Sequence, residues 1–374
     1  MPLNGDSSDI QGPWILSVPA PRAQDFLREL QAHGLLDRSF KIIKRDGRVF
    51  VPIVIDHPFD LDLFGARWEG SEDLPLRTVS RDPWDRLREA LSAAGIPVKL
   101  APRRWKRIGD VLILRLEPEA AGDARTIAHI FGTVLGARTV VEDRSGIHGP
   151  LRTPDVRVLW GNGTETQHTE AGVRYALDVS KVMFSPGNVA ERIGLAKRIP
   201  RGAVVVDLFA GIGYFSLPIA VRGRPEIVYA CELNPLSYAF LLRNIRLNRA
   251  ENVVPLYGDC RDVAPRGVAD WVLMGHFDAR AYLDVAFAVL RGRGTIVFHE
   301  LCPKEQFPDA FALRLAAASR AHWMRVLSIQ THVVKSYAPG ILHAVAEVRV
   351  ASQMRDFRAK QISMMVPLGP AGVT

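Results

Sequence analysis

Cysteine is scarce in this sequence, which has 3 cysteines among 374 residues. Cys231, Cys260 and Cys302 are too scattered for a disulfide framework, and none forms a Cys-x-x-Cys pair, so zinc and thiol-redox motifs are not expected. No apolar run approaches about 18 residues, so no transmembrane helix is expected. The first ten residues lack the charged start and apolar run of a signal peptide. We therefore expect a cytoplasmic protein without a metal site and without a membrane anchor.

Acidic residues are fewer than basic ones, with 40 Asp and Glu against 48 Lys and Arg, and the pI is about 9.6. The charge is uneven, because residues 1–80 contain 9 basic and 12 acidic residues while the remainder contains 39 and 28. A basic body of this size suits a polyanion such as nucleic acid. A solvated surface with a high isoelectric point explains the charge equally well.

The length and the composition, 48% hydrophobic and 24% charged, predict two or three globular domains. Two strand-like runs flank Asp46-Gly47, which is a strong hairpin signal in the N-terminal part. Asp82-Pro83 is a helix cap followed by proline and begins the next part. The predicted boundaries are 12–80 for a small α+β domain, 82–187 for a connecting α+β domain that binds RNA, 188–352 for a catalytic domain and 353–374 for a tail.

Alternating strand-like and helix-like segments after residue 188 predict a doubly wound parallel sheet in an α/β domain. Two later strand candidates, 324–333 and 343–350, are separated by Pro339-Gly340 and predict an antiparallel edge. The buried strands are expected at 203–206, 227–231, 253–256, 271–274 and 295–298.

Three loops in this domain carry the residues of a nucleoside site. A buried strand ends in Asp207, and a glycine turn containing Gly211 follows; glycine lets the backbone pass close to a ligand beyond the carboxyl ends of the strands. Glu232 ends the next strand and is placed to accept hydrogen bonds from ribose hydroxyls. Asp259 follows the third strand and is placed to bind the adenine amino group. Together these loops fit S-adenosylmethionine better than NAD, whose fingerprint needs a third glycine.

The fourth strand is followed by Met274-Gly275-His276. Methyltransferases that act on base amines usually carry an Asn/Asp-Pro-Pro-aromatic loop here, so simple amine methylation is disfavoured. His276 is a candidate base-contacting or proton-transferring group, and the alternative is a loop histidine that faces solvent or the rim of the sheet.

A turn and helix-start signal, Ser185-Pro186-Gly187-Asn188, precedes Arg192 by about two helical turns. An arginine here is able to pair with a carboxylate, such as the methionine end of the cofactor. Taken by themselves, these residues favour helix capping and a surface salt bridge.

Four cations surround one aromatic residue in the sequence Arg103-Arg104-Trp105-Lys106-Arg107. Cations bind phosphates, and bases splayed from an RNA loop stack on aromatic rings. This cluster is a candidate RNA-facing surface. The alternative is that Trp105 belongs to the core and the cations are merely solvated.

The segments 104–111, 181–192 and 207–215, and Glu232 with Asn234-Pro235, resemble the archaeal and eukaryotic enzymes that modify tRNA position 37. These are the guanine-N1-methyltransferases and the wybutosine-synthesising aminocarboxypropyltransferases. The resemblance covers roughly residues 84–350. It implies a class I S-adenosylmethionine-dependent (Rossmann-like) domain preceded by smaller α+β domains, tRNA as partner, and cofactor contacts from Ser185, Arg192, Glu232 and Asp259.

The loop Met274-Gly275-His276 departs from the methyltransferase branch and is similar to the aminocarboxypropyl branch, as are 185–188 and 337–340. Residues 12–80, in contrast, look like the extra N-terminal domain of the archaeal methyltransferases. The resemblance therefore implies transfer of the 3-amino-3-carboxypropyl group of S-adenosylmethionine to 4-demethylwyosine at position 37 of tRNA(Phe), with methylthioadenosine released.

Three alternatives stay open at this point. The nearest is a methyltransferase acting on guanosine-37 N1 or on a wyosine-precursor carbon. A non-catalytic RNA-binding protein is opposed by the intact acids at 207, 232 and 259. An oxidoreductase is opposed by the missing third glycine. The sequence does not identify a general base.

Overall fold

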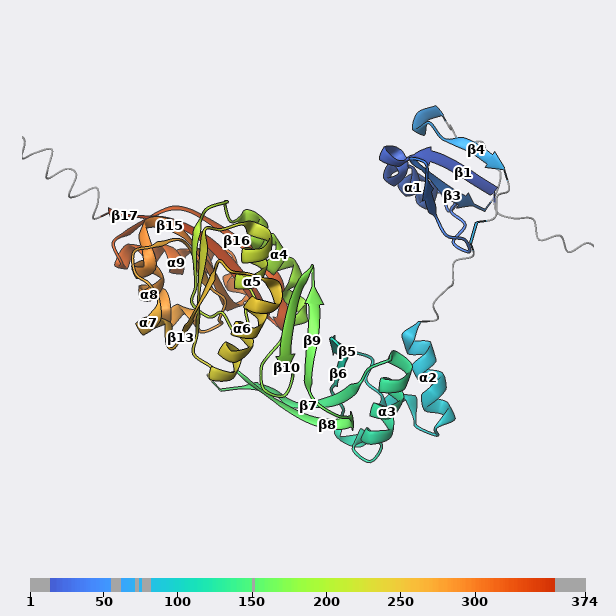
Figure 1. Ribbon diagram of the computed structural model, residues 1–374, viewed down its shortest axis with the longest axis horizontal. Coiled ribbons are helices and arrows are strands. Elements are labelled where there is room, and N and C mark those ends of the chain that lie inside the picture. Colours follow the sequence, from blue (N-terminus) through green and yellow to red (C-terminus); the bar gives the residue numbers. More distant parts are fainter. Residues whose placement is uncertain (1–13, 55–61, 71–73, 76–81, 150–151, 354–374) are drawn as a thin grey trace, which may run out of the picture. The chain divides into compact units, whose positions relative to one another are not determined.

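The computed structural model describes residues 14–54, 62–70, 74–75, 82–149 and 152–353 (Figure 1). The chain divides into two compact units, Met1–Arg86 and Leu87–Thr374. Residues 69–81 are rich in charged and turn-forming residues and predict a linker. Most of this segment and nearly all of the predicted tail lie outside the described residues. Glu69 is an exception, because it lies in a strand.

The first unit contains a four-stranded sheet in the order β2-β3-β1-β4, with α1 against it. Its elements are β1 Trp14–Pro19, α1 Ala23–Ala32, β2 Ile43–Arg45, β3 Arg48–Ile53 and β4 Arg67–Gly70. Phe26 and Leu30 of α1 pack with Leu16 of β1 in its core. Asp46 and Gly47 both have positive φ, 48° and 75°, as a two-residue turn between β2 and β3 requires. The predicted hairpin is confirmed.

The second unit begins with mixed helices and strands, and β5, β6, β7 and β8 form a sheet in that order. The helix α2, Pro83–Ala93, spans the division between the two units. The elements that follow it are β5 Trp105–Ile108, β6 Val111–Leu114, α3 Ala124–Leu135, β7 Thr139–His148, β8 Thr153–Gly161, β9 Glu165–Glu170 and β10 Val173–Asp178. The Asp82 carboxylate accepts the Trp84 N–H at 2.9 Å, which confirms the predicted cap. The sequence pattern predicts strands at 111–116, 156–159 and 173–177, which correspond to β6, β8 and β10, but it does not predict β5, β7 or β9. The β9 sequence is wholly polar, and this strand is defined by its antiparallel pairing with β10.

The rest of the second unit is built on a seven-stranded sheet in the order β13-β12-β11-β14-β15-β17-β16. The first five strands pair in parallel, and β17 runs antiparallel to both neighbours, as predicted. The register of the edge strand β16 shifts at three places along β17. The strands are β11 Val204–Asp207, β12 Ile227–Glu232, β13 Val253–Tyr257, β14 Ala269–Met274, β15 Leu290–Pro303, β16 Met324–Ala338 and β17 Ile341–Ser352.

Helices cover this sheet and connect its strands. They are α4 Val189–Arg198, α5 Ser216–Pro218, α6 Pro235–Asn248, α7 Cys260–Val263, α8 Leu283–Val289 and α9 Asp309–Ala321. The sequence pattern predicts a helix over 279–290. The observed helix is shorter, because Ala279–Tyr282 is a 3-10 turn and Leu290 already belongs to β15.

One hydrophobic core extends across the boundary predicted near residue 187. Val173 and Leu177 of β10 are buried in the same cluster as Val205 of β11 and Leu241 of α6. Fully burying one such side chain stabilises a fold by about 1.5–3 kcal/mol. The hairpin β9–β10 therefore packs against the seven-stranded sheet. The domain boundaries predicted inside this unit stay predictions.

Asn244 links α6 to two other segments. Its side chain is fully buried, and its amide donates to the carbonyls of Ala176 and Ile212, both at 3.1 Å. Its oxygen accepts the Ala176 N–H at 2.7 Å. Because Ala176 lies in β10 and Ile212 in the glycine turn, one side chain fixes the position of both.

We expect Asn244→Ala to lower the free energy of unfolding by about 2–4 kcal/mol, because it leaves buried backbone groups without partners. Urea denaturation followed by tryptophan fluorescence measures this change. Arg246→Ala, at an exposed position on the same helix, is the control and should stay within about 0.5 kcal/mol of the wild type. Equal losses in the two variants would contradict this role for Asn244.

Candidate functional site

The loops that follow β11, β12, β13 and β14 meet at the carboxyl ends of these strands. The Gly211 N–H donates to Glu232 Oε2 at 2.7 Å, which joins the first two loops. The Gly258 N–H donates to the Glu232 carbonyl at 3.0 Å, which brings in the third. The rings of Phe209 and His276 lie 5.4 Å apart and join the fourth. The structure thus brings Gly211, Glu232 and His276 to one edge of the sheet.

Asp207 stabilises the glycine turn through hydrogen bonds. Its carboxylate is fully buried and accepts hydrogen bonds from the Ser216 hydroxyl at 2.7 Å and from the Phe209 N–H at 3.3 Å. Burial raises the pKa of Asp207 to about 6. This acid was predicted to bind the cofactor, and its position indicates that it acts by holding the loop.

Gly211 occupies a conformation that other residues rarely adopt. Its φ is +58°, and a Cβ would lie 2.2 Å from the Tyr214 ring. The Tyr214 hydroxyl in turn donates to the Met183 carbonyl, so this ring has little freedom to move away. The turn therefore requires glycine here for space as well as for backbone conformation.

Glu232 is held by backbone groups on both sides. Besides Gly211, the Asn234 N–H donates to its Oε1 at 2.7 Å, and burial raises the pKa of the carboxyl group. A carboxylate has about four lone-pair sites, so each oxygen keeps acceptor capacity for a ribose hydroxyl. Leu233, the next residue, leaves 47% of its surface exposed and offers an apolar contact beside this acid.

Asp259 already has a partner in the structure. The Arg261 Nε and Nη2 donate to its two oxygens at 3.0 and 2.5 Å, and these bonds lower the pKa of Asp259. The Arg261 guanidinium also lies over the Tyr282 ring at 5.3 Å. An adenine amino group would have to share this carboxylate with Arg261, and the predicted contact stays a prediction.

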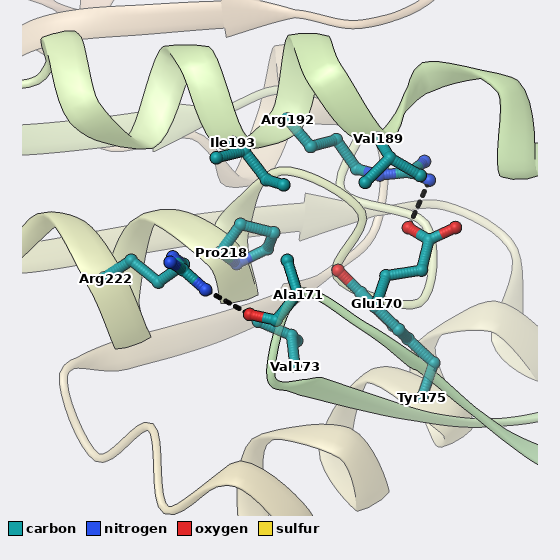
Figure 2. Close-up of a pocket in the computed structure, with 9 residues that line it drawn as sticks. All are labelled: Glu170, Ala171, Val173, Tyr175, Val189, Arg192, Ile193, Pro218 and Arg222. Carbon is teal, nitrogen blue, oxygen red and sulfur yellow. Dashed lines mark hydrogen bonds and ion pairs between the residues drawn. The ribbon is translucent and has the colours of Figure 1, made fainter. Parts of the chain in front are cut away.

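Arg192 lies inside the protein, with an exposed fraction of 3%. Its Nη2 donates to Glu170 at 2.5 Å (Figure 2). The same nitrogen donates to the Ser185 carbonyl at 3.1 Å. The salt bridge considered from the sequence is therefore buried rather than on the surface. Figure 2 also shows that both residues line a small cavity. The Arg192 Nε is buried without a hydrogen-bond partner among the described residues, so one donor remains available.

His276 is half-buried after β14. Its Nδ1 accepts the Asp278 N–H at 3.1 Å, which assigns the proton of the neutral ring to Nε2. Burial and the nearby Arg152 lower the pKa of His276, so the ring is neutral at pH 7. In this form His276 can donate a hydrogen bond through Nε2 to a base carbonyl, whereas its Nδ1 is already occupied.

Arg152 is a cation near this edge that the sequence reasoning missed. Its guanidinium lies over the Phe277 ring at 5.6 Å, and its Nη2 lies 3.1 Å from Met183 Sδ. Its Nε is buried without a hydrogen-bond partner among the described residues, and its φ is +55°. No local pattern marks this arginine, because its place depends on how β7 and β8 pack against residues 183 and 277.

The cluster 103–107 divides into two kinds of residue. Trp105 packs edge-on against the Phe131 ring at 5.6 Å, and Arg107 donates to the carbonyls that end α3, Leu135 at 2.7 Å and Gly136 at 3.0 Å. Arg103, Arg104 and Lys106 are exposed. The structure gives Trp105 and Arg107 clear packing roles, and the RNA contact of the cluster stays a prediction.

In the described ranges, no group of three or more His, Cys, Asp or Glu side chains could hold a metal ion. A helix with the length and apolarity needed to cross a bilayer is likewise not found in that part of the chain.

Two protein-family models match the second unit. The TRM5/TYW2 methyltransferase domain matches residues 166–327, and the TYW2 N-terminal domain matches residues 87–164.

Individual relatives extend this similarity. The chain is 39% identical over 280 residues to the tRNA(Phe) (4-demethylwyosine(37)-C(7)) aminocarboxypropyltransferase of Pyrococcus horikoshii, covering 74% of this chain and 99% of that enzyme. It is 31% identical over 342 residues to the tRNA (guanine(37)-N(1))-methyltransferase Trm5b of Pyrococcus abyssi, covering 90% and 98%. The crystal structure of Methanocaldococcus jannaschii TYW2 in complex with AdoMet superposes with a TM-score of 0.56 at 33% identity, covering 67% and 100%.

We expect Gly211→Ala to weaken S-adenosylmethionine binding at least about tenfold, because the added methyl group meets Tyr214 and displaces the N–H that Glu232 accepts. Isothermal titration with the cofactor measures the change. Gly202→Ala is the matched control, since its φ is also positive, +76°, but nothing lies within 4 Å of its Cβ. Similar affinities in the two variants would show that space at residue 211 is unimportant.

We expect Asp207→Asn to gain stability relative to the wild type as the pH rises. The pKa of about 6 in the folded chain lies above the unfolded value of about 3.9, so ionising Asp207 between these pH values destabilises the fold. Between pH 4.5 and pH 7, the free energy of unfolding of the variant should rise relative to the wild type by roughly 2 kcal/mol.

Urea denaturation at both pH values measures this difference. Asp284→Asn removes an exposed carboxylate from α8 and should show no comparable change. A pH-independent difference between Asp207→Asn and the wild type would disprove the raised pKa.

Proposed function

The chain belongs to the TRM5/TYW2 family, and from this membership we propose that it transfers the 3-amino-3-carboxypropyl group of S-adenosylmethionine to 4-demethylwyosine at position 37 of tRNA(Phe). It is a tRNA-modifying transferase of wybutosine biosynthesis that uses S-adenosylmethionine. The observation that carries this conclusion is the match to the P. horikoshii aminocarboxypropyltransferase over 99% of that enzyme. The loop Met274-Gly275-His276, which lacks the amine-methylating motif, supports the same branch.

The residues at the carboxyl edge of the sheet fit the adenosine part of this cofactor. A glycine at position 211 leaves room for a ligand beside the turn, and Leu233 offers an exposed apolar surface. Glu232 would accept hydrogen bonds from the ribose hydroxyls. Asp259 would bind the adenine amino group. When bound, S-adenosylmethionine supplies a sulfonium whose carbon substituents are electrophilic.

The choice between these carbons is a matter of orientation, since the reacting atoms must approach to about 3–3.5 Å in line. We assign this orientation to Ser185 and Arg192, whose segment is fixed by Glu170 and by the hydrogen bond from Arg192 to the Ser185 carbonyl. The free Nε of Arg192 is the donor available for the carboxylate of the methionine chain. Transfer breaks a C–S bond, forms a C–C bond, and removes one proton from the acceptor carbon.

The tRNA partner would present its anticodon region to this edge, in the cytoplasm. Arg103, Arg104 and Lys106 are exposed cations of the same compact unit and would contact phosphates. His276 would donate through Nε2 to the acceptor base.

Methyl transfer to guanine-37 is the second candidate, and one observation favours it. The match to Trm5b covers 342 residues, more than the second unit contains, and so includes part of the first unit. The two candidates differ in the spent cofactor. Aminocarboxypropyl transfer leaves methylthioadenosine, and methyl transfer leaves adenosylhomocysteine.

We expect methylthioadenosine, and an acceptor nucleoside heavier by one aminocarboxypropyl group, after incubation with S-adenosylmethionine and tRNA(Phe) that carries 4-demethylwyosine. Mass spectrometry of the digested tRNA and of the supernatant measures both products. The same tRNA with unmodified guanosine at position 37 is the control substrate and should stay unchanged. Adenosylhomocysteine, together with methylated guanosine in the control, would assign the enzyme to the methyltransferase branch.

A further inference from the structure

Lys335 on β16 is a partly buried cation without a carboxylate partner. Its Nζ donates to the Asn188 side chain at 3.0 Å, at the turn 185–188. No ion pair of the described ranges involves Lys335. An ammonium group has three donors, so further donors remain after the bond to Asn188.

Other positive charges converge on the same turn. Burial, Arg192 and Lys106 all lower the pKa of Lys335, which places two further cations within electrostatic range of its ammonium. Arg192 is neutralised by Glu170. Lys106 lies 3.9 Å from Asp143, a long distance for an ion pair. Lys335 therefore has other cations within electrostatic range and no carboxylate partner among the described residues, an arrangement that favours a bound anion.

Lys335 also lies close to the carboxyl edge of the seven-stranded sheet, where the loop after β14 carries His276. Two residues further along β16, the Tyr337 ring packs against Phe277 at 5.4 Å. Phe277 directly follows His276, which lies at the edge where the acceptor base is proposed to enter. Lys335 thus lies between the turn 185–188 and the loop after β14.

We propose that Lys335, together with the Asn188 amide, binds a backbone phosphate of the tRNA beside the nucleotide that is modified. This inference rests on the proposed function, because it takes tRNA as the partner. A phosphate offers several acceptor oxygens to donors from different elements, and lysine binds it as a point charge. The site would fix the register of the RNA strand and would not read its sequence.

The carboxylate of S-adenosylmethionine is the competing anion, and the salt dependence of binding separates the two. Each phosphate contact contributes about 0.7 to the slope of log K against log salt for a single strand. We expect Lys335→Met to reduce this slope by about that amount for tRNA binding and to weaken binding by about three- to tenfold in 0.1 M KCl. The affinity for S-adenosylmethionine should stay within about twofold.

Fluorescence anisotropy with labelled tRNA between 50 and 300 mM KCl measures the slope, and isothermal titration measures cofactor binding. Lys335→Arg keeps the charge and should keep the slope. Lys197→Met removes an exposed lysine from α4 as the matched control and should leave both measurements unchanged. Thermal unfolding of each variant confirms that it is folded.

An unchanged slope with weaker cofactor binding would overturn the proposal and assign Lys335 to the cofactor carboxylate. An unchanged slope with unchanged cofactor binding, in a wild type that binds and modifies tRNA, would overturn the phosphate site alone. A wild-type protein that does not bind tRNA would overturn both this inference and the proposed function.

Discussion

The hydrogen bond from the Gly211 N–H to the Glu232 carboxylate is the contact on which the site depends. It joins the loops of two neighbouring strands, and it forms only because residue 211 adopts a positive φ. Asp207 accepts a hydrogen bond from Ser216 after the same turn, and the Asn244 amide donates to the Ile212 carbonyl within it. The glycine turn is therefore fixed before any ligand arrives, which lowers the entropic cost of binding.

The catalytic sheet could be predicted from the sequence because its strands are short apolar runs and its acids stand directly at their ends. Asp207 and Glu232 were singled out by that logic, and the predicted order of loops agrees with the fold. The antiparallel edge followed from Pro339-Gly340 and two β-rich segments. Signals of this kind are local, and a parallel sheet brings its carboxyl ends to one edge whatever the intervening helices contain.

Features that depend on distant pairing could not be predicted. The polar strand β9 carries Glu170, whose contact with Arg192 turns a proposed surface pair into a buried one. Arg152 contacts the Phe277 ring beside the loop after β14, and no local sequence pattern predicts this contact. The sequence left open whether Trp105 stacks on RNA or packs in the core, and its contact with the Phe131 ring depends on a partner in α3. In each case the partner lies far along the chain, and composition near the residue gives no information about it.

The shifted register of β16 has a consequence for solubility. A strand of this length at the end of a sheet offers unpaired N–H and C=O groups to any other extended chain, and Leu327 and Val333 add exposed apolar surface along it. Three bulges break the repeat of those groups and twist the strand locally. At the opposite edge, Pro255 removes one donor from β13. Both edge strands of the described sheet thus carry features that disfavour pairing with another extended chain.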